Sequence, residues 1–411
     1  MVSTLPLLPL ILILLALRVV ANPVAVEKNI MLARRFSSPG TSTIVDRDRA
    51  RAQSLLKPRA QKYASAQAGA VDVPATNAVV TFTTTVDVGS TNYTLIIDTG
   101  SSNTWIGNDK PYTPGEKSRE GGNLVLLQYG SGCFLGDEWI DQVTLGHDLS
   151  ISDQSIGVAL LTNGFEDVDI DGILGIGPVD LTVGTLYPDV NGTVPTVTNN
   201  LYAQKKIGQE TIGIYFSNGN EESGELTFGG TDKTKYKGEI TYTGITTESP
   251  ASNYWGIDQS IAYGKLPILP LTAGIVDTGT TLILLASDAF KTYQAATGAT
   301  FDNSTGLLKI TKPQYDKLHD LNFYIELTQI ILQQEFRLTP NAQIWPRSLN
   351  GDIGGGADDI FLIVGDLGTD SGAGLDFING YAFLERFYSV YDGTDKRVGF
   401  APTKYTNATT N

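Results

Sequence analysis

Sulfur-containing and imidazole side chains are scarce in this sequence of 411 residues, which contains one cysteine, two methionines and two histidines. Because Cys133 is the only thiol, no intramolecular disulfide can form. Small secreted domains need such crosslinks, whereas a domain of roughly 340 residues buries enough apolar surface without them. We therefore expect Cys133 to be a small buried hydrophobic residue, with a reactive thiol near a functional site as the alternative.

The scarcity of histidine disfavours two classes of site. A Ser-His-Asp triad and a histidine-rich zinc site both need a histidine in a suitable setting. His147 falls in a predicted surface turn over residues 145–148, and His319 is the other histidine of the chain. We expect neither a catalytic triad nor a metal site, and no motif indicates a cofactor.

Positive charge is concentrated near one end of the chain. Residues 22–69 contain nine Lys or Arg and three Asp or Glu, a net charge of +6. Residues 70–411 contain 19 basic and 41 acidic residues, a net charge of −22. An acidic body repels phosphate groups, so nucleic acid is not an expected partner. A basic segment ahead of an acidic body predicts an electrostatic partner within the chain itself.

Long apolar runs are also absent, apart from one at the start of the chain. Leu5 to Leu17 is an apolar run of 13 residues, which is too short to span a bilayer comfortably. The small residues Val19 and Ala21 follow it as they do before a signal-peptide cleavage site, although Arg18 is the first basic residue. We expect residues 1–21 to be a signal peptide, with an uncleaved anchor as the alternative.

Two further features agree with secretion. The polar tail over residues 404–411 gives no indication of a lipid anchor. The chain also carries four Asn-X-Ser/Thr sequons, at Asn92, Asn191, Asn303 and Asn407. The sequence therefore predicts a secreted, extracellular glycoprotein whose mature form has no membrane attachment.

The basic segment cannot form a core of its own. Residues 27–67 are rich in Ala, Ser, Arg and Gln and contain few large apolar side chains. Part of the segment, for example residues 46–56, is able to form a helix. Its position between the signal peptide and the body predicts a prosegment over residues 22–69, and a disordered linker is the alternative.

From about residue 78 the sequence is typical of a β protein. Short runs of Val, Thr, Ile, Tyr and Phe are separated by Gly, Asn, Asp and Ser every eight to twelve residues. The 44 glycines agree with many tight turns. Predicted strands include residues 79–88, 93–97, 225–228, 239–242 and 387–391, and predicted helices cover residues 287–296 and 313–319. The predicted fold class is all-β.

An internal repeat divides the body. Residues 95–102 (Leu-Ile-Ile-Asp-Thr-Gly-Ser-Ser) recur 179 residues later as residues 274–281 (Gly-Ile-Val-Asp-Thr-Gly-Thr-Thr). A second motif follows in each half, at residues 171–175 (Asp-Gly-Ile-Leu-Gly) and 377–380 (Phe-Ile-Asn-Gly). The repeat predicts two homologous lobes. We place them at residues 70–243 and 244–411, related by a pseudo-twofold axis with a cleft between them.

Each copy of the repeat is an apolar strand that delivers an aspartate, Asp98 or Asp277, into a tight turn. The glycine of each turn lets another backbone approach closely, and the neighbouring hydroxyl groups can orient the carboxylate by hydrogen bonds. If the axis brings the two aspartates together, they cannot both ionise easily, so one pKa falls and the other rises. One carboxyl group then serves as general base toward a water and the other as general acid. This pair could hydrolyse an amide at acid pH without a metal.

These motifs resemble those of the pepsin-like aspartic proteases, from about residue 73 to the C-terminus. The resemblance rests on residues 98–105 (Asp-Thr-Gly-Ser-Ser-Asn-Thr-Trp), 128–132 (Gln-Tyr-Gly-Ser-Gly), 277–281 (Asp-Thr-Gly-Thr-Thr) and 383–392 (Phe-Leu-Glu-Arg-Phe-Tyr-Ser-Val-Tyr-Asp). It implies a bilobal, pepsin-like fold and an aspartic endopeptidase that cuts polypeptides beside hydrophobic residues. It also implies a monomer that needs no cofactor.

The resemblance assigns roles to individual residues. Asp98 and Asp277 would be the catalytic pair, and Tyr129 would close a flap over the substrate with Trp105 as the partner of its hydroxyl. The other flap and substrate-binding residues that it implies are Gly100, Ser101, Gly130, Ser131, Gly279, Thr280 and Thr281. Hydrophobic subsites would be lined by Ile96, Ile170 and Ile173, for which simple core packing is the alternative.

The chain departs from the family pattern at three positions. Ser131 stands where many members have an aspartate that is associated with accepting lysine at the cleavage site. Asn379 stands in the second downstream motif where Leu-Gly is commoner. Cys133, in the strand that follows the flap, is also unusual.

Two other functions fit these motifs less well than proteolysis does. Glycoside hydrolysis also uses paired carboxylates, but it does not explain a duplicated Asp-Thr-Gly motif. A catalytically inactive pepsin-like protein that binds or inhibits another protein would usually have lost an aspartate or a flanking residue, and neither is lost here. For the precursor, we expect the prosegment to lie across the cleft as an intramolecular inhibitor at neutral pH, with a Lys or Arg near the aspartate pair.

Overall fold

The computed structural model describes residues 28–35, 43–57, 81–130, 132–146, 149–165, 169–217, 223–327 and 333–410. The expected signal peptide, Ser131 of the flap motif and His147 lie outside these residues. Within the described ranges, none of the helices combines the length and the hydropathy that crossing a membrane requires.

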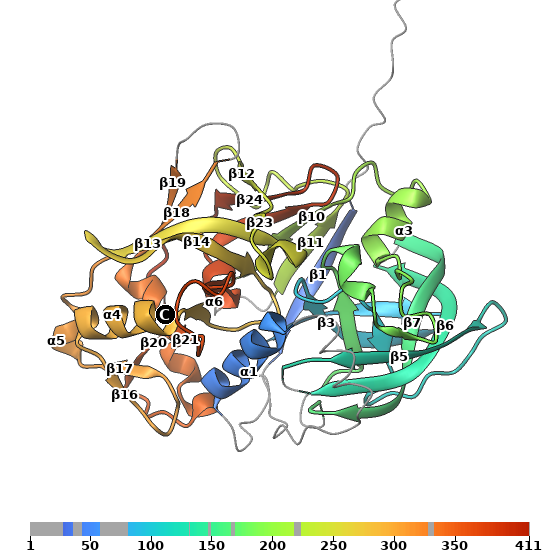
Figure 1. Cartoon of the computed structure of the whole chain (residues 1–411), viewed down its shortest axis with the longest axis horizontal. Helices are drawn as coiled ribbons and strands as arrows, with labels where there is room; N and C mark the ends of the chain where they lie inside the picture. Colours follow the sequence, from blue (N-terminus) through green and yellow to red (C-terminus); the bar gives the residue numbers. More distant parts are fainter. Residues whose placement is uncertain are drawn as a thin grey trace, which may run out of the picture.

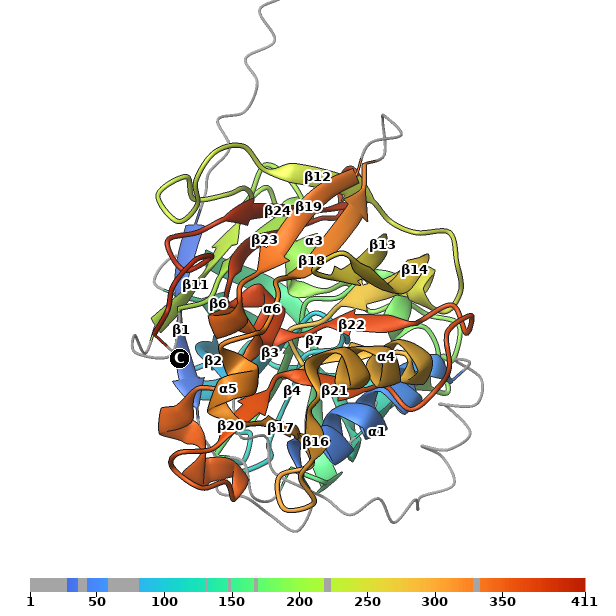
Figure 2. The ribbon, with the colours of Figure 1, turned by 90° about the vertical axis from the view of Figure 1, so that its left-hand side faces the viewer.

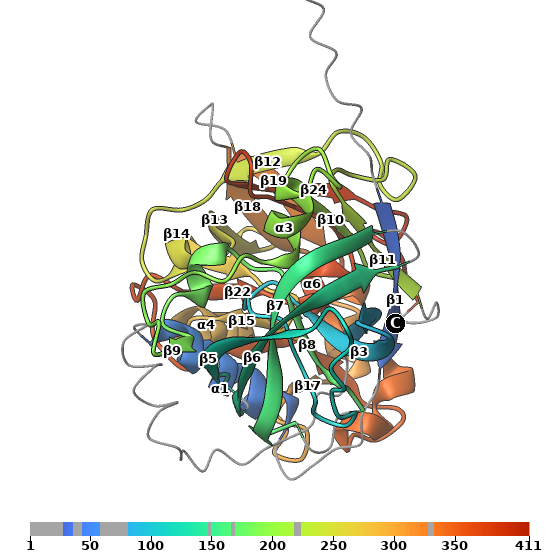
Figure 3. The same ribbon diagram turned by 90° about the vertical axis from the view of Figure 1, so that its right-hand side faces the viewer.

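One large sheet runs through the molecule and links its two halves. It contains 14 strands within the described residues. In sheet order these are β12 (Thr241–Gly244), β24 (Arg397–Pro402), β23 (Phe387–Asp392), β10 (Thr211–Tyr215), β11 (Ser223–Phe228), β1 (Lys28–Arg35), β2 (Thr81–Val88), β3 (Thr91–Asp98), β8 (Gly172–Gly175), β4 (Trp105–Ile106), β7 (Leu149–Asn163), β6 (Cys133–Leu145), β5 (Arg119–Gln128) and β9 (Leu186–Tyr187). The long hairpins of β5, β6 and β7 form the outer face of the N-terminal half (Figure 3).

The C-terminal half is built on two smaller sheets. The larger of them has the order β19 (Gln333–Leu338), β18 (Leu321–Glu326), β13 (Gly256–Tyr263), β14 (Leu266–Val276), β22 (Phe377–Asn379), β15 (Ile283–Leu285) and β21 (Val364–Asp366). The smaller one has the order β16 (Thr300–Phe301), β17 (Leu308–Ile310) and β20 (Ile360–Leu362). Figure 2 shows these strands together with α4 and α5 on the outer face of this half.

Helices are short and lie around the sheets. The α-helices are α1 (Ile44–Leu56), α3 (Val197–Ala203), α4 (Ser287–Thr297), α5 (Lys312–Tyr315) and α6 (Tyr381–Leu384). The 3-10 helices are η1 (Val179–Thr182), η2 (Ala251–Asn253), η3 (Pro340–Gln343), η4 (Arg347–Leu349) and η5 (Gly351–Ile353). The longest α-helix among the described residues, α1, lies between the two halves of the molecule (Figure 1).

The two halves repeat one arrangement of three strands. In the first half, β3 runs parallel to β8, and β8 runs antiparallel to β4. In the second half, β14 runs parallel to β22, and β22 runs antiparallel to β15. The register places Asp98 beside Gly175 in the first half and Val276 beside Asn379 in the second. The two sequence repeats therefore fold into the same local structure, and the predicted all-β, bilobal fold is confirmed.

The basic segment contributes a strand and a helix to this fold. β1 lies between β11 and β2 and pairs antiparallel with both, so it is an interior strand of the large sheet. α1 begins after Thr43, whose side chain accepts a hydrogen bond from the Asp46 N–H while Asp46 bonds back to the Thr43 N–H. It covers the helix expected at residues 46–56 and begins two residues earlier.

Other elements agree with the sequence except at their ends. α4 matches the helix expected over residues 287–296, whereas the one expected over 313–319 is the single turn of α5 at Lys312–Tyr315. The strand expected over 239–242 is β12, Thr241–Gly244. Such ends depend on tertiary pairing, which local propensity does not specify.

Candidate active site

Asp98 and Asp277 lie at the centre of the molecule, where the two repeats face each other. Both side chains are buried. The loops that carry them are joined by a reciprocal pair of hydrogen bonds: the Thr99 N–H donates to Thr278 Oγ1 at 3.0 Å, and the Thr278 N–H donates to Thr99 Oγ1 at 2.9 Å. The same hydroxyls donate across the axis to the carbonyls of Val276 and Ile97. This symmetric contact fixes the position of one aspartate relative to the other.

Each carboxylate is oriented by its own turn. Asp98 accepts hydrogen bonds from the Gly100 N–H at 3.0 Å and from Ser101 Oγ at 2.5 Å. Asp277 accepts the equivalent bonds from the Gly279 N–H at 3.1 Å and from Thr280 Oγ1 at 2.6 Å. The structure therefore places the two pairs of turn residues alike around the two carboxylates.

The glycines of these turns are required by the closeness of the two lobes. A Cβ atom at Gly100 would lie 2.6 Å from Asp277 Oδ1, and one at Gly279 would lie 2.6 Å from Asp98 Oδ1. Such contacts are too short for any side chain. The carboxylate of each lobe therefore packs directly against the turn of the other.

Arg51 of α1 lies between the two carboxylates. Its Nη2 is 2.6 Å from Asp98 Oδ1 and its Nε is 2.7 Å from Asp277 Oδ2, with a third bond of 2.9 Å from Nη2 to Asp277 Oδ1. Burial would lower the pKa of Arg51, but the charges of Asp277 and Asp98 outweigh it and hold this pKa well above its usual value. The guanidinium occupies the space between the two carboxylates.

The same cation separates the titration of the two aspartates. Burial would raise the pKa of Asp277, but the charge and hydrogen bonds of Arg51, together with the bonds from Thr280 and Gly279, hold it below its usual value. Burial, aided by the charge of Asp277, raises the pKa of Asp98 in spite of Arg51. In this state Asp277 is therefore the more firmly ionised member of the pair.

Arg47 and Asp48 of α1 bind the loop that follows Asp277 in the C-terminal half. The carboxylate of Asp48 accepts bonds from the backbone N–H groups of Thr281 at 3.1 Å and Leu282 at 2.8 Å. Arg47 donates to Thr281 Oγ1 at 2.7 Å. Burial raises the pKa of Asp48, although Arg47 and the two N–H donors oppose this. These contacts and that of Arg51 come from the same stretch of one helix.

A hairpin between β5 and β6 covers the site from the other side. Tyr129 lies at its turn, and its hydroxyl accepts a hydrogen bond from Trp105 Nε1 at 2.8 Å. The ring of Tyr129 packs edge-on against Phe165, at 5.6 Å between centroids. A Cβ atom on Gly130 would clash with the backbone of Arg51, so α1 passes directly against the tip of the hairpin. Ser131, the next residue, is not among the described ones.

The isoleucines expected to line subsites pack beneath this hairpin. Ile170 and Ile173 are buried in one cluster with Trp105 and Tyr129, and Ile96 packs against that cluster. They therefore form an apolar wall behind Tyr129.

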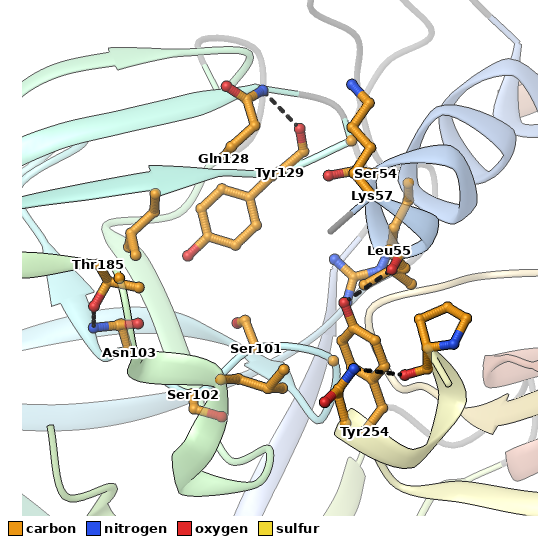
Figure 4. Close-up of a pocket in the computed structure, with 18 of the residues that line it drawn as sticks. Ser54, Leu55, Lys57, Ser101, Ser102, Asn103, Gln128, Tyr129, Thr185 and Tyr254 are labelled. Carbon is orange, nitrogen blue, oxygen red and sulfur yellow. Dashed lines mark hydrogen bonds between the residues drawn. The ribbon is translucent and has the colours of Figure 1, made fainter. Parts of the chain in front are cut away.

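Beside α1, part of the cleft remains as a cavity of about 240 Å³. Figure 4 shows the ring of Tyr129 pointing into it from the hairpin, with Ser101 on the opposite wall and Tyr254 toward α1. Leu126, Leu127, Leu181 and Val183 add apolar lining. The cavity is large enough for apolar side chains of a peptide.

Two of the departures from the family pattern have a structural account. Asn379 is fully buried and exchanges two side-chain hydrogen bonds with Gln259, of 3.1 and 3.0 Å. The amide pair satisfies both polar groups where an apolar residue would otherwise pack. Cys133 was expected to be buried, but it is only partly buried, at the start of β6 opposite Gln128.

Some residues of the site could not be singled out from the sequence. Arg51 is one of nine basic residues in its segment, so it could not be distinguished from the others. Asp48 and Asp366, a residue of the C-terminal half that binds Arg49, were not predicted as site residues. The spacing of Asp48 and Arg51 places them on one face of a helix and was the available signal.

Comparison with known proteins gives one answer. Residues 81–403 match the model of the family described as eukaryotic aspartyl protease. Polyporopepsin of Irpex lacteus is 57% identical over 345 residues, which are 82% of this chain and 99% of that protein. Cathepsin E of Rattus norvegicus is 31% identical over 343 residues, 77% of this chain and 79% of that one.

The fold is also similar to that of a solved structure. The crystal structure of aspartic proteinase from Irpex lacteus superposes with a TM-score of 0.77 at 57% identity, covering 80% of this chain and 96% of that one. The chain therefore belongs to the eukaryotic aspartyl protease family and is an aspartic endopeptidase.

Proposed function

We propose that this chain is the precursor of a secreted aspartic endopeptidase in which Asp98 and Asp277 are the catalytic pair. The observation that carries the proposal is the convergence of two buried carboxylates, 2.6 and 2.7 Å from the same guanidinium. The acid-activated protein should cleave a denatured polypeptide near pH 4, and a statine-type transition-state mimic should block this cleavage. Failure of the purified, folded protein to cleave at any acid pH would contradict the proposal.

Chemistry becomes possible once Arg51 leaves the site. Two carboxylates this close share one proton, because their like charges oppose full ionisation. The ionised member takes a proton from a water as the water attacks the scissile carbonyl, and the protonated member gives its proton to the carbonyl oxygen. The tetrahedral intermediate then breaks its C–N bond as the nitrogen takes the proton that the first carboxyl group gained from the water, and one hydroxyl of the intermediate returns a proton to the other carboxylate. No group of the protein becomes covalently attached to the substrate.

A preference for hydrophobic residues around the scissile bond is supported by the lining of the cleft. Leucine side chains of β5 and the ring of Tyr254 form much of the cavity beside the aspartates. Burial of an apolar side chain there releases about 1.5–3 kcal/mol. Peptides with Leu or Phe on either side of the cleaved bond should be preferred substrates.

Residues 22–69 act in this proposal as an intramolecular inhibitor. The backbone of α1 lies against the tip of the flap hairpin at Gly130, and Arg51 occupies the space needed by the water and the scissile carbonyl. A substrate cannot bind while the helix is in place. Secretion is supported by the apolar run at the start of the chain and by the exposure of all four sequon asparagines.

Acid is expected to release this inhibitor, and the sign follows from Asp277. The charge of Arg51 lowers the pKa of Asp277 and acts in the same direction on Asp98, whose pKa stays raised because of burial and of the charge of Asp277. The Arg51–Asp277 ion pair therefore stabilises docking above the pKa of the free carboxyl, about 3.9, and loses its contribution as the pH falls below that value. Asp48 has a raised pKa and opposes this change, because it binds its proton more readily when docked. The affinity of a synthetic peptide of residues 22–69 for the mature enzyme should therefore decrease from pH 7 to pH 3.

The Asp48→Asn peptide provides the comparison. Asparagine cannot bind the proton that Asp48 takes up in the docked state. The affinity of this peptide for the mature enzyme should therefore fall more steeply from pH 7 to pH 3, as measured by fluorescence polarisation. An affinity that stays constant or rises toward pH 3 for the natural peptide would contradict acid release through the Arg51 contact.

Tyr129 is proposed to close the flap over substrate. Tyr129→Ala should lower kcat/KM by about ten- to a hundredfold, because the substrate is held less accurately. Tyr129→Phe keeps the ring and removes only the hydroxyl that accepts from Trp105, a loss of about 1 kcal/mol or fivefold. Steady-state kinetics and melting temperatures should be measured together. If Tyr129→Ala loses mainly thermal stability, the residue is part of the core and not of the flap.

A further inference from the structure

Asp366 binds a second arginine of α1, Arg49, at a site separate from the catalytic pair. It is the last residue of β21 and lies opposite Leu285 of β15 in the sheet of the C-terminal half. Arg49 donates from Nη2 to Asp366 Oδ2 at 3.2 Å and from Nε to the Asp366 carbonyl oxygen at 3.1 Å. One residue therefore offers a charged and a neutral acceptor to the same guanidinium.

The carboxylate is fixed by groups of the protease body. Ser287 Oγ donates to Asp366 Oδ1 at 2.6 Å, and the Gly368 N–H donates to the same oxygen at 2.9 Å. Gly368 has a φ of +94°, and a Cβ atom there would lie 3.1 Å from Cδ of Arg49. The absence of a side chain therefore leaves room for the aliphatic part of a bound arginine. None of these groups belongs to residues 22–69, so they remain after that segment is removed.

Asp366 binds α1 two residues from the arginine that occupies the catalytic pair. Arg49 is two residues from Arg51, whose guanidinium is at the catalytic pair. The side chain of Asp366 is 24% exposed even with Arg49 bound. An extended peptide advances about 3.3 Å per residue, so four residues on each side of the cleaved bond sample about 13 Å in each direction.

We propose that Asp366 is a specificity-determining residue that binds an arginine side chain of the substrate a few positions from the scissile bond. The inference rests on the proposed function, because it assigns a substrate class to the same cleft. A guanidinium fits the two acceptors better than the single point charge of lysine does. Because the pair is partly exposed to solvent, we expect a preference of about fivefold in kcat/KM.

The test uses the full-length chain after acid activation and a set of fluorogenic octapeptides. All of them share one hydrophobic pair at the cleaved bond, and arginine is scanned through the other positions against citrulline, which has the same shape without the charge. At one position, arginine should exceed citrulline by about fivefold in kcat/KM. Asp366→Asn should reduce that ratio to about one.

Asp370→Asn is the matched control, since it removes an exposed carboxylate from the same loop. It should keep the arginine preference. Ser287→Ala, which frees the carboxylate of Asp366 without removing its charge, should give an intermediate ratio. Equal rates for arginine and citrulline at every position would overturn the inference and leave Arg49 as a contact of the precursor alone. No cleavage of any peptide would count against the proposed function instead.

Discussion

Asp277→Asn is expected to lower kcat for peptide hydrolysis by about 10²–10⁴-fold, the range that a general acid or base contributes. Asparagine has the shape of aspartate but can neither accept the proton of the attacking water nor return one to the substrate. The same loss is expected for Asp98→Asn. Both variants should be assayed on a fluorogenic peptide at pH 4, with circular dichroism to confirm the fold.

The double variant sharpens this test. Because the two carboxyl groups act as one unit, the loss in Asp98→Asn/Asp277→Asn should be no larger than in either single variant. Asp370→Asn removes a carboxylate outside the site and should retain full activity. A folded single variant with more than a small percentage of the original kcat would refute the assignment of the pair.

Arg51→Met in the full-length chain is expected to open the cleft at neutral pH. Methionine fills much of the same space but leaves two buried carboxylates without their cation, which costs about 3–5 kcal/mol. At 1.4 kcal/mol per tenfold, the docking of α1 weakens by about two to four orders of magnitude. A statine-type mimic, which competes with α1 for the cleft, should bind the variant more tightly by the same factor at pH 7.

Arg49→Met is the control for this experiment. It removes a cation from the same helix, but its pair with Asp366 is partly exposed, with side-chain exposures of 36% and 24%. Such pairs contribute about 0.2–1 kcal/mol, so the mimic should gain no more than about fivefold. If Arg51→Met and Arg49→Met gave the same small gain, the contact of Arg51 with the aspartates would not be what keeps the cleft closed.

The repeat of residues 95–102 at residues 274–281 carried most of what could be predicted from the sequence. Duplicated strands that each end in Asp-Thr-Gly predict two homologous lobes, and packing of these lobes about a pseudo-twofold axis brings the two aspartates together. The choice of Arg51 among nine basic residues could not be predicted, since it depends on the angle at which α1 enters the cleft. The pairing of β1 was also hidden, because its partners β2 and β11 are about 50 and 195 residues away in the chain.

The place of Asn379 illustrates the same limit. Its neighbours in the sequence identify a buried strand, where an amide is unexpected. The residue that accounts for it, Gln259, is 120 positions away and was not recognisable as its partner. Polar pairs inside a core are therefore visible only once the strands have been assembled.

The interior position of β1 has a consequence for the lifetime of the enzyme. If residues 22–69 are cut away after folding, the large sheet forms with a strand, β1, that is absent from the mature protein. A mature molecule that unfolds cannot refold by the pathway of the precursor, because residues 22–69, which include β1, are no longer part of the chain. Its durability is then a matter of how slowly it opens and not of an equilibrium between folded and unfolded chains. Each mature molecule that unfolds is therefore lost as an active enzyme.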